Sequence, residues 1–383
     1  MFIAIRDLAF AKGRFLLMGF VVALVAYLMT FLSGLSAGLI SNNVSGLMVL
    51  PVTHFSFQYD DTPTFRGSLI DQPMWDGWAG KPGVLKSEPM GHTTFNGRGQ
   101  NNEPLEFVLW GVRPGSFLEP PVAEGEPLGK VENGVIISKL LAARGVKLGD
   151  KITLDRVQTE LTVIGVTGDE RNYEHAPIVY APLRKWQEAT YGPPGGAPPG
   201  EKLPDVVYQY ASAVALDLDQ TVTPEAIGAI DEELGTVTLN LERSYQTSPA
   251  YQVEVFTVQA IQAFLVVASV VLIGAFFIIW TIQRTAEIGL LKALGASNAY
   301  VLRDSLGQAL LLMLGGIVVG VGLGMVTGAA FKAMATAGFP FQLEATTALG
   351  SAFLLLVAGL IGSALSIRLI TSVDPIIALG RDR

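Results

Sequence analysis

The sequence predicts an integral membrane α-helical protein: four transmembrane helices with an inserted α+β extracytoplasmic domain. Half of the 383 residues are hydrophobic and only 16% are charged, whereas soluble globular proteins average about 25% charged residues. The hydrophobic residues gather in four stretches of about 20 or more residues without a charged side chain, the length needed to cross a bilayer. Strand, helix and turn patterns fill the long block between the first and second stretch.

The four uncharged stretches set the order of the predicted segments. They are Phe15–Ile40, Thr257–Gln283, Ser305–Phe331 and Ala345–Ile367. In chain order we expect an amphipathic N-terminal helix (1–14), the first span (15–40), the extracytoplasmic domain (41–256), the second span (257–283), a cytoplasmic helix and loop (284–304), the third span (305–331), a short outer loop (332–344), the fourth span (345–370) and a cytoplasmic tail (371–383). The first span is too long for a signal peptide, so we expect it to be retained.

Basic residues predict the orientation of the spans. They lie before the first span, between the second and third, and after the fourth: Arg6, Lys12, Arg14, Arg284, Lys292, Arg303, Arg368, Arg381 and Arg383. The loop between the third and fourth spans holds only Lys332 and Glu344 as charged residues. Because basic residues are enriched in cytoplasmic loops, we expect a multi-pass plasma-membrane protein with both termini cytoplasmic and residues 41–256 outside.

The extracytoplasmic block mixes strand and helix patterns. Strands are expected at Gly83–Phe95 and Leu105–Val112, a hairpin-like pair at Lys151–Leu154 and Glu160–Val166, and helices at Ile137–Arg144 and Thr223–Leu234. Thr223 is the expected N-cap of the last helix, with Pro224 at its first position. The Pro- and Gly-rich stretch Tyr191–Pro204 predicts an exposed loop. We therefore expect an α+β domain.

Several function classes are disfavoured by composition. A net charge of −8 argues against nucleic acid as a partner, and the lack of cysteine excludes disulfides and thiolate metal sites. His54, His92 and His175 have no ligand spacing, so we expect surface or turn histidines rather than haem or metal ligands. Gly195–Lys202 resembles a phosphate-binding loop only weakly, because prolines and Glu201 interrupt it. We expect no catalytic residues, no intrinsic cofactor and no metal of its own.

The spans contain glycines at a spacing of four residues. They are Gly34 and Gly38 in the first span, and Gly316, Gly320, Gly324 and Gly328 in the third. Small residues at this spacing favour close helix packing, with flexibility for gating as the alternative. No Asp, Glu, Lys, Arg or His lies deep in any span, which argues against ion-coupled transport. A hydrophobic substrate taken sideways from the outer leaflet, or no transported substrate, fits this composition better.

The segment after the second span reads Arg-Thr-Ala-Glu-Ile-Gly-Leu-Leu-Lys-Ala-Leu-Gly-Ala over residues 284–296. Its charges alternate with apolar residues, so it is a short amphipathic helix that lies on lipid or docks a cytoplasmic partner. This segment strongly resembles the one after the second span of MacB/FtsX-type ABC permeases. The topology, the N-terminal Ile3–Phe10, the outer stretch Val135–Val166 and the tail Asp374–Gly380 are also similar to that family.

The resemblance implies a homodimer of this chain in the lipid bilayer with two separately encoded ATPase subunits, which bind ATP and Mg²⁺. The helix at Glu287–Leu294 would sit in a groove of the ATPase. Arg284, Glu287 and Lys292 would set its register, and Ile288 and Leu291 would supply the buried contact. This chain would then be the non-enzymatic membrane subunit of an efflux pump.

Size and layout most resemble the HrtB-type haem-export permeases of that family. The resemblance implies a haem site at the outer ends of the helices, between two protomers, with apolar walls and one or two iron ligands. The candidate residues are Tyr27, Met29, Phe31, Tyr251, Glu254, Phe256 and Gln259. The outer half of the first span has no carboxylate, so Met29 or Tyr251 would ligate the iron. Alternatively, these are packing residues and members of an interfacial aromatic belt.

Other tasks within the family remain open. The outer domain could transmit force to an extracellular cell-wall hydrolase, or the protein could extract a lipid or lipoprotein. Partnership with a sensor kinase is a third possibility, which the modest outer domain disfavours.

Overall fold

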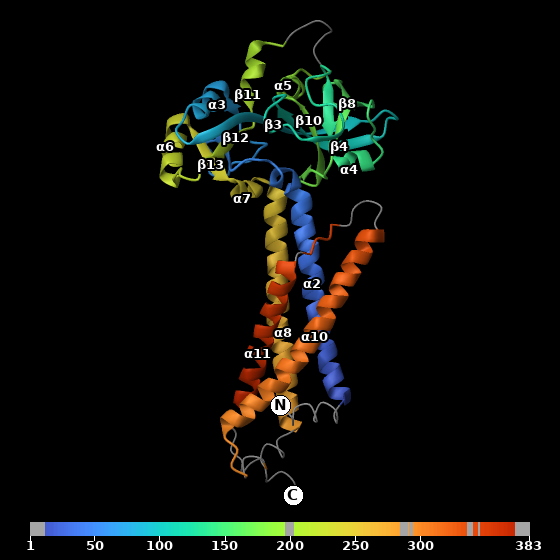
Figure 1. Cartoon of the computed structure of the whole chain (residues 1–383), viewed down its shortest axis with the longest axis vertical. Coiled ribbons are helices and arrows are strands. Elements are labelled where there is room, and N and C mark those ends of the chain that lie inside the picture. The colour runs from blue at the N-terminus through green and yellow to red at the C-terminus, as the bar shows by residue number, and fades with distance from the viewer. Residues whose placement is uncertain are drawn as a thin grey trace. The chain divides into compact units, whose positions relative to one another are not determined.

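The computed structural model describes residues 12–195, 203–283, 290, 294–334, 340–343 and 345–371. The chain divides into a helical unit, Met1–Leu39 with Glu254–Arg383, and a strand-rich unit, Ile40–Val253 (Figure 1). The predicted N-terminal helix (Ile3–Phe10), most of the cytoplasmic segment that follows the second span and the tail after residue 371 lie outside the described residues.

Four long apolar helices account for the predicted spans. They are α2 (Lys12–Met48), α8 (Pro249–Gln283), α10 (Asn298–Met334) and α11 (Ala345–Thr371). Among the described residues, four helices are long and apolar enough to cross a membrane. A helix satisfies all its backbone hydrogen-bonding groups internally, which the interior of a bilayer requires.

Two of these helices continue beyond the apolar stretches that predict them. Helix α2 ends at Met48 rather than near residue 40, and α8 begins at Pro249 rather than at 257. The residues that lengthen α2 include Asn42, Asn43 and Ser45, so the uncharged apolar stretch ends before the helix ends. The backbone of Val44 departs from helical geometry (φ −126°, ψ 16°) and introduces a kink in this polar extension.

Glycines allow α10 to approach α2 closely. A Cβ atom on Gly316 would lie 2.7 Å from Val22 Cγ1, and one on Gly320 would lie 2.6 Å from Ala26 Cβ. At Gly324 it would lie 3.0 Å from Thr30 Cγ2. Distances this short leave no room for a side chain, so the glycine face of α10 lies directly against α2.

The other three glycines of the set lie against the short segment 340–343. Cβ atoms on Gly34 and Gly328 would overlap the ring of Phe341, and one on Gly38 would overlap the backbone of Pro340. The backbone N–H of Gln342 donates a hydrogen bond to the carbonyl of Gly34 (3.0 Å). This segment is therefore seated on the glycines of α2.

Hydrogen bonds also join three helices inside the apolar region. Gln262 Nε2 of α8 donates to Ser33 Oγ of α2 (3.1 Å), and Ser33 Oγ lies 3.1 Å from Ser351 Oγ of α11. Polar side chains in a membrane span bond across helices because lipid offers them no partner.

The strand-rich unit is built on an eleven-stranded sheet in the described residues. Nine strands follow the order β13-β1-β12-β3-β4-β10-β6-β8-β5; β7 pairs with β3 and β8, and β9 pairs with β10, while β11 and β2 form a separate pair. The strands are β1 (His54–Gln58), β2 (Ile70–Asp71), β3 (Val84–Arg98), β4 (Pro104–Val112), β5 (Val122–Gly125), β6 (Gly134–Ile137), β7 (Lys151–Leu154), β8 (Glu160–Thr167), β9 (Asn172–Tyr173), β10 (Ala176–Pro182), β11 (Tyr210–Ala211), β12 (Ala213–Leu218) and β13 (Thr236–Asn240).

Strand β3 belongs to both halves of this sheet. Its first half pairs with β12 and its second half pairs with β4. The short helices of the unit are α3 (Gln72–Ala79), α4 (Lys139–Ala143), α5 (Leu183–Tyr191), α6 (Pro224–Leu234) and α7 (Leu241–Ser244), with 3₁₀ turns at Asp205–Gln209 and Tyr245–Thr247. Helices α3 and α6 contribute to an apolar cluster beside β12, and α4 and α5 to another beside β4 and β10. A third apolar cluster, which includes Phe55, Met90, Trp110 and Ala215, spans both halves of the sheet across β3.

Most of the predicted outer elements are present. Strands β7 and β8 form the antiparallel pair, and α6 has the expected Thr223 N-cap and Pro224. Helix α4 is shorter than predicted, because Gly134–Ile137 forms the buried strand β6 and Ser138 caps the helix. In the predicted loop Tyr191–Pro204, α5 ends at Tyr191, and residues 196–202 lie outside the described residues.

The glycine contact predicts different effects for two substitutions on α10. Gly320→Leu should lower the free energy of unfolding by about 1–3 kcal/mol, because the new side chain overpacks the α2 contact. Gly322→Leu is the matched control, since a Cβ there would meet no atom within 4 Å. Thermal unfolding of the purified protein in detergent measures both. Equal unfolding temperatures for the two variants would contradict the described packing.

Candidate functional site

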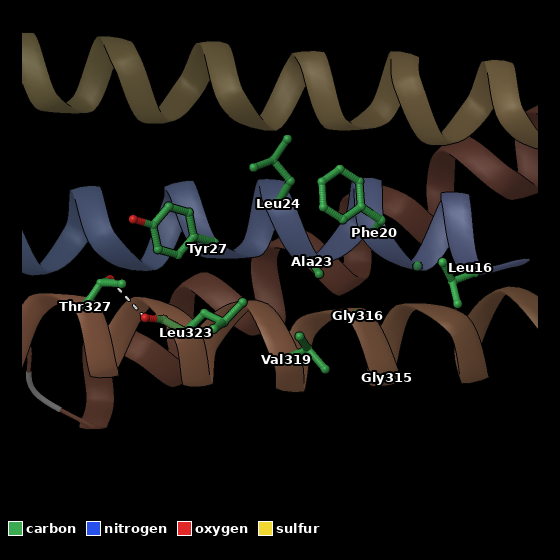
Figure 2. Close-up of a pocket in the computed structure, with 11 residues that line it drawn as sticks. Leu16, Phe20, Ala23, Leu24, Tyr27, Gly315, Gly316, Val319, Leu323 and Thr327 are labelled. Carbon is green, nitrogen blue, oxygen red and sulfur yellow. Dashed lines mark hydrogen bonds between the residues drawn. The ribbon is translucent and has the colours of Figure 1, made fainter.

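A groove runs along the contact between α2 and α10 (Figure 2). Its volume is about 620 Å³. The residues that line it are Leu16, Gly19, Phe20, Ala23, Leu24, Tyr27, Gly315, Gly316, Val319, Leu323 and Thr327. The polar side-chain atoms in this set are the hydroxyls of Tyr27 and Thr327, and Thr327 Oγ1 already donates to the carbonyl of Leu323 (2.9 Å). A molecule in this groove would be held by apolar contacts.

An aromatic cluster begins where this groove ends. The rings of Tyr27 and Phe31 stack with their centroids 5.9 Å apart. Phe31 also contacts Phe341 at 5.7 Å and Phe331 at 6.2 Å. The structure therefore brings together two of the predicted haem residues, Tyr27 and Phe31, and adds two phenylalanines that the sequence did not indicate.

Met29 lies apart from that aromatic cluster. Its side chain is only 2% exposed and belongs to the apolar core of the four helices, together with Val25 and Met313. Neighbouring positions on a helix point in different directions, so residues 27, 29 and 31 cannot all share one face. Within a single chain, the Met29 sulfur is covered by other side chains.

The remaining haem candidates lie at the start of α8. Tyr251, in the strand-rich unit, packs against Tyr245 with ring centroids 6.1 Å apart. Glu254, Phe256 and Gln259 belong to the helical unit, where Phe256 is 73% exposed and Gln259 is also exposed. These side chains are exposed or partly buried.

The predicted ATPase-contacting residues Arg284, Glu287, Ile288, Leu291 and Lys292 lie outside the described residues. The contact with an ATPase remains a prediction from the sequence.

A buried asparagine fastens the polar end of α2 inside the strand-rich unit. Asn43 is fully buried, and its main-chain carbonyl accepts a hydrogen bond from the backbone N–H of Glu174 (2.8 Å). Ser248 Oγ, directly before α8, donates to Asn43 Oδ1 (2.9 Å). Asn43 Nδ2 also lies 3.5 Å from His175 Nε2. One residue thus connects the end of α2, the start of α8 and the turn between β9 and β10.

The turn between β9 and β10 has an unusual backbone. Glu174 and His175 both have positive φ angles, 51° and 63°. Residues other than glycine rarely adopt this left-handed backbone conformation. It therefore costs free energy that surrounding contacts must offset. The bonds to Asn43 supply such contacts, as does the hydrogen bond from the Asn172 backbone N–H to Ser45 Oγ (2.9 Å). We call this set of contacts the Asn43 junction.

The core behind this hairpin contains a buried histidine. His92 on β3 is 5% exposed, and Trp110 Nε1 donates to its Nδ1 (3.1 Å). Its ring contacts Tyr173, with centroids 4.8 Å apart. The prediction of a surface or turn histidine is therefore wrong for His92, because β3 places it in the core between aromatic rings. Burial lowers the pKa of His92 to about 3.

The other two histidines are less enclosed. His175 lies in the β9–β10 turn, and His54 begins β1, where its Nδ1 is 3.0 Å from Thr53 Oγ1. In the described part of the chain, no group of three or more His, Cys, Asp or Glu side chains is placed to hold a metal ion.

Comparison with known sequences covers most of the chain. Residues 15–232 match the MacB-like periplasmic core domain, and residues 260–375 match the FtsX-like permease C-terminal domain. The chain belongs to the MacB/FtsX-like permease family. It is thus a multi-pass plasma-membrane ABC permease whose strand-rich unit is extracytoplasmic.

Full-length relatives are found in staphylococci. Proteins of Staphylococcus epidermidis and Staphylococcus haemolyticus carry the provisional name hemin transport system permease protein HrtB. Each is 24% identical to this chain, and the alignments cover 99% of both chains.

Solved structures of outer domains are also similar to part of this permease. The periplasmic region of MacB from Actinobacillus actinomycetemcomitans matches with a TM-score of 0.36 and 13% identity, over 54% of this chain and 96% of that one. The extracellular domain of the ABC-type transporter YknZ from Gram-positive bacteria matches with a TM-score of 0.34 and 14% identity, over 49% and 98% respectively.

The Asn43 junction predicts a local effect of substitution. Asn43→Ala should destabilise the protein by about 1–3 kcal/mol, because it removes the side-chain oxygen that binds the buried hydroxyl of Ser248. The Glu174 N–H binds the main-chain carbonyl of residue 43, which alanine keeps, so amide hydrogen exchange of the full-length permease should become faster around Ser248. Asn101→Ala, at an exposed position, serves as the control. Unchanged exchange around Ser248 would show that the Asn43 side chain does not fasten this segment.

The buried His92 predicts a pH dependence of stability. An unfolded histidine titrates near pH 6.5, whereas the folded pKa is about 3. Below pH 6.5 the unfolded state therefore binds a proton that the folded state excludes, so the unfolding free energy falls, by up to about 1.4 kcal/mol per pH unit. Denaturant unfolding followed by tryptophan fluorescence between pH 7 and 5 should show a shallower pH dependence in His92→Gln. The same slope in both proteins would be the contrary result.

Proposed function

We propose that this permease is the membrane subunit of an ATP-driven efflux pump that exports a hydrophobic compound, with haem as the best single candidate. The observation that carries the proposal is the apolar membrane interior: the four spans lack charged residues and histidine, and the groove and the aromatic cluster are lined by apolar side chains. Ion-coupled carriers normally need ionisable groups at this depth. The name of the full-length relatives supports haem among hydrophobic cargoes.

A haem site needs apolar walls and an iron ligand. Tyr27, Phe31, Phe331 and Phe341 would supply an aromatic wall. Because Met29 is buried within one chain, ligation by its sulfur would require the helices to move. The phenol oxygens of Tyr27 and Tyr251 are more accessible alternatives, and tyrosine is a known haem ligand.

The pump would contain two copies of this chain and two ATPase subunits. Only 17% of the most apolar stretch of α8 is buried by the rest of the chain. The corresponding share for α2 is 44%. Its residues Phe256, Phe264, Val267 and Val271 are all more than 60% exposed and lie on one helix face. This exposed face supports contact of α8 with the second copy. Residues 284–296 would dock the ATPase, in which ATP and Mg²⁺ bind.

A second candidate function is the transmission of force to an extracellular cell-wall hydrolase, or the extraction of a lipid or lipoprotein. The Asn43 junction favours it, because this junction ties the ends of α2 and α8 to the turn that leads into β10, a strand in the middle of the outer sheet. A movement of these helix ends would reach the sheet directly. Binding of a hydrolase to the full permease, without any effect of haem, would favour this function.

Haemin titration tests the haem proposal. The permease is purified with its ATPase in nanodiscs, and the Soret band and ATP hydrolysis are followed together. We expect a saturable Soret shift with altered ATP hydrolysis, and loss of the shift in Tyr27→Phe, Tyr251→Phe or Met29→Leu. Tyr59→Phe is the control, since Tyr59 is 70% exposed in the strand-rich unit.

The outcomes separate the parts of the proposal. A shift that survives all three substitutions would keep haem as the cargo but reject these ligands. No shift and no change in hydrolysis would reject haem.

A further inference from the structure

One face of α2 carries two aromatic side chains followed by two glycines. They are Tyr27, Phe31, Gly34 and Gly38, and steps of three and four residues place them on the same face of a helix. Because α2 runs from the cytoplasmic to the outer side, the glycines lie nearer the outer surface of the membrane than the aromatic pair does. The route from the outer side to the aromatic cluster therefore passes over these glycines.

The segment 340–343 covers this outer end of the cluster. Phe341 is 6% exposed, and its ring centroid lies 5.7 Å from that of Phe31, with 31° between the two ring planes. Tyr27 stacks on the same Phe31 ring, with 5.9 Å between the centroids and 19° between the planes. The ring of Phe341 thus extends the stack that begins with Tyr27 and Phe31. It takes up contact surface of Phe31 that a flat aromatic cargo would use.

Phe341 differs from the rest of the aromatic cluster in the part of the chain that carries it. Tyr27 and Phe31 belong to α2, and Phe331 belongs to α10. The segment 340–343, which carries Phe341, has no regular secondary structure. Withdrawal of this segment would therefore move one ring of the cluster and leave the helices that hold the other three intact.

The seat of this segment on α2 depends on glycine. Phe341 is the buried residue among 340–343, and the backbone N–H of Gln342 donates to the carbonyl of Gly34 (3.0 Å). A Cβ atom on Gly38 would overlap the backbone of Pro340. Alanine at position 38 would therefore push the segment from its seat while the Phe341 side chain stays in the protein.

We propose that Phe341 is a displaceable stopper of the cargo site. Without cargo its ring occupies the outer end of the aromatic cluster, and a flat aromatic compound takes its place against Phe31. This inference rests on the proposed export of a hydrophobic compound, and it names planar ring systems as the cargo class. Removal of a fixed wall residue weakens binding. A site that is open in only a fraction of the molecules binds more weakly by that fraction, so removal of a stopper strengthens binding.

Haemin affinity distinguishes a stopper from a wall. The permease with its ATPase in nanodiscs is titrated with haemin in the absence of ATP, and the Kd is taken from the Soret band. We expect Phe341→Ala to lower the Kd about tenfold, which corresponds to an open site in about one wild-type molecule in ten. Gly38→Ala keeps the ring but unseats the segment, so it should also lower the Kd. Two controls should leave the Kd unchanged: Phe353→Ala, at a side chain that is 68% exposed, and Gly322→Ala, where a Cβ meets no atom within 4 Å.

The outcomes separate the stopper from haem export. Haemin binding by the wild type, with an equal or higher Kd in Phe341→Ala, would reject the stopper and leave haem export intact. Binding by Phe341→Ala alone would support the stopper. Binding by neither protein would reject haem and, with it, this role of Phe341.

A thermal unfolding curve shows whether Phe341→Ala is folded. If it is not, 4-fluorophenylalanine at position 341 of the otherwise unchanged permease replaces the variant, and zinc protoporphyrin is the diamagnetic probe. A fluorine signal that becomes accessible to a water-soluble gadolinium chelate as the porphyrin binds supports displacement of the ring. A signal that stays inaccessible while the porphyrin binds rejects it.

Discussion

The hydrogen bonds of buried Asn43 join three segments within the strand-rich unit: the polar end of α2, Ser248 and the turn between β9 and β10. Its carbonyl binds the Glu174 backbone, and its side-chain oxygen binds Ser248. A buried polar group without a partner costs far more than the net gain of an ordinary hydrogen bond. The position of these segments therefore depends on one residue, whose main chain and side chain both have partners. Through the β9–β10 hairpin, the same contacts reach β10, which lies between β4 and β6 in the sheet.

In the membrane, the corresponding constraint is the lack of a hydrophobic force between helices. Lipid is as apolar as leucine, so helices associate through close packing and occasional hydrogen bonds. The glycines of α10 provide the close packing, and the contacts among Gln262, Ser33 and Ser351 provide the hydrogen bonds. The missing side chain of a glycine permits this packing. Where neighbouring side chains do not fill the space beside the glycine, as at Gly315, it leaves a groove instead. A glycine-rich helix can thus create both a tight contact and an open groove.

The sequence predicted the elements whose signal is local. Charge-free runs identified the four spans, and Thr223 and Pro224 identified the start of α6. It failed where the outcome depends on distant partners. Asn43 follows an apolar stretch and resembles an interfacial residue, but its partners Glu174 and Ser248 are far along the chain. His92 is buried because β3 and β4 place it next to Trp110. Met29 faces the helix core because its neighbours determine the rotation of α2, and a charge-free helix carries little information about that rotation.

The transfer of haem out of a bilayer tests the central claim most directly. Proteoliposomes that contain the permease with its ATPase are loaded with haemin, and an external apo-haem protein reports the haem that leaves the membrane through its Soret band. The account predicts that ATP with Mg²⁺ accelerates this transfer and that an ATPase unable to hydrolyse ATP abolishes the acceleration. Transfer at the same rate with and without ATP, from a complex shown to hydrolyse ATP, would contradict haem export.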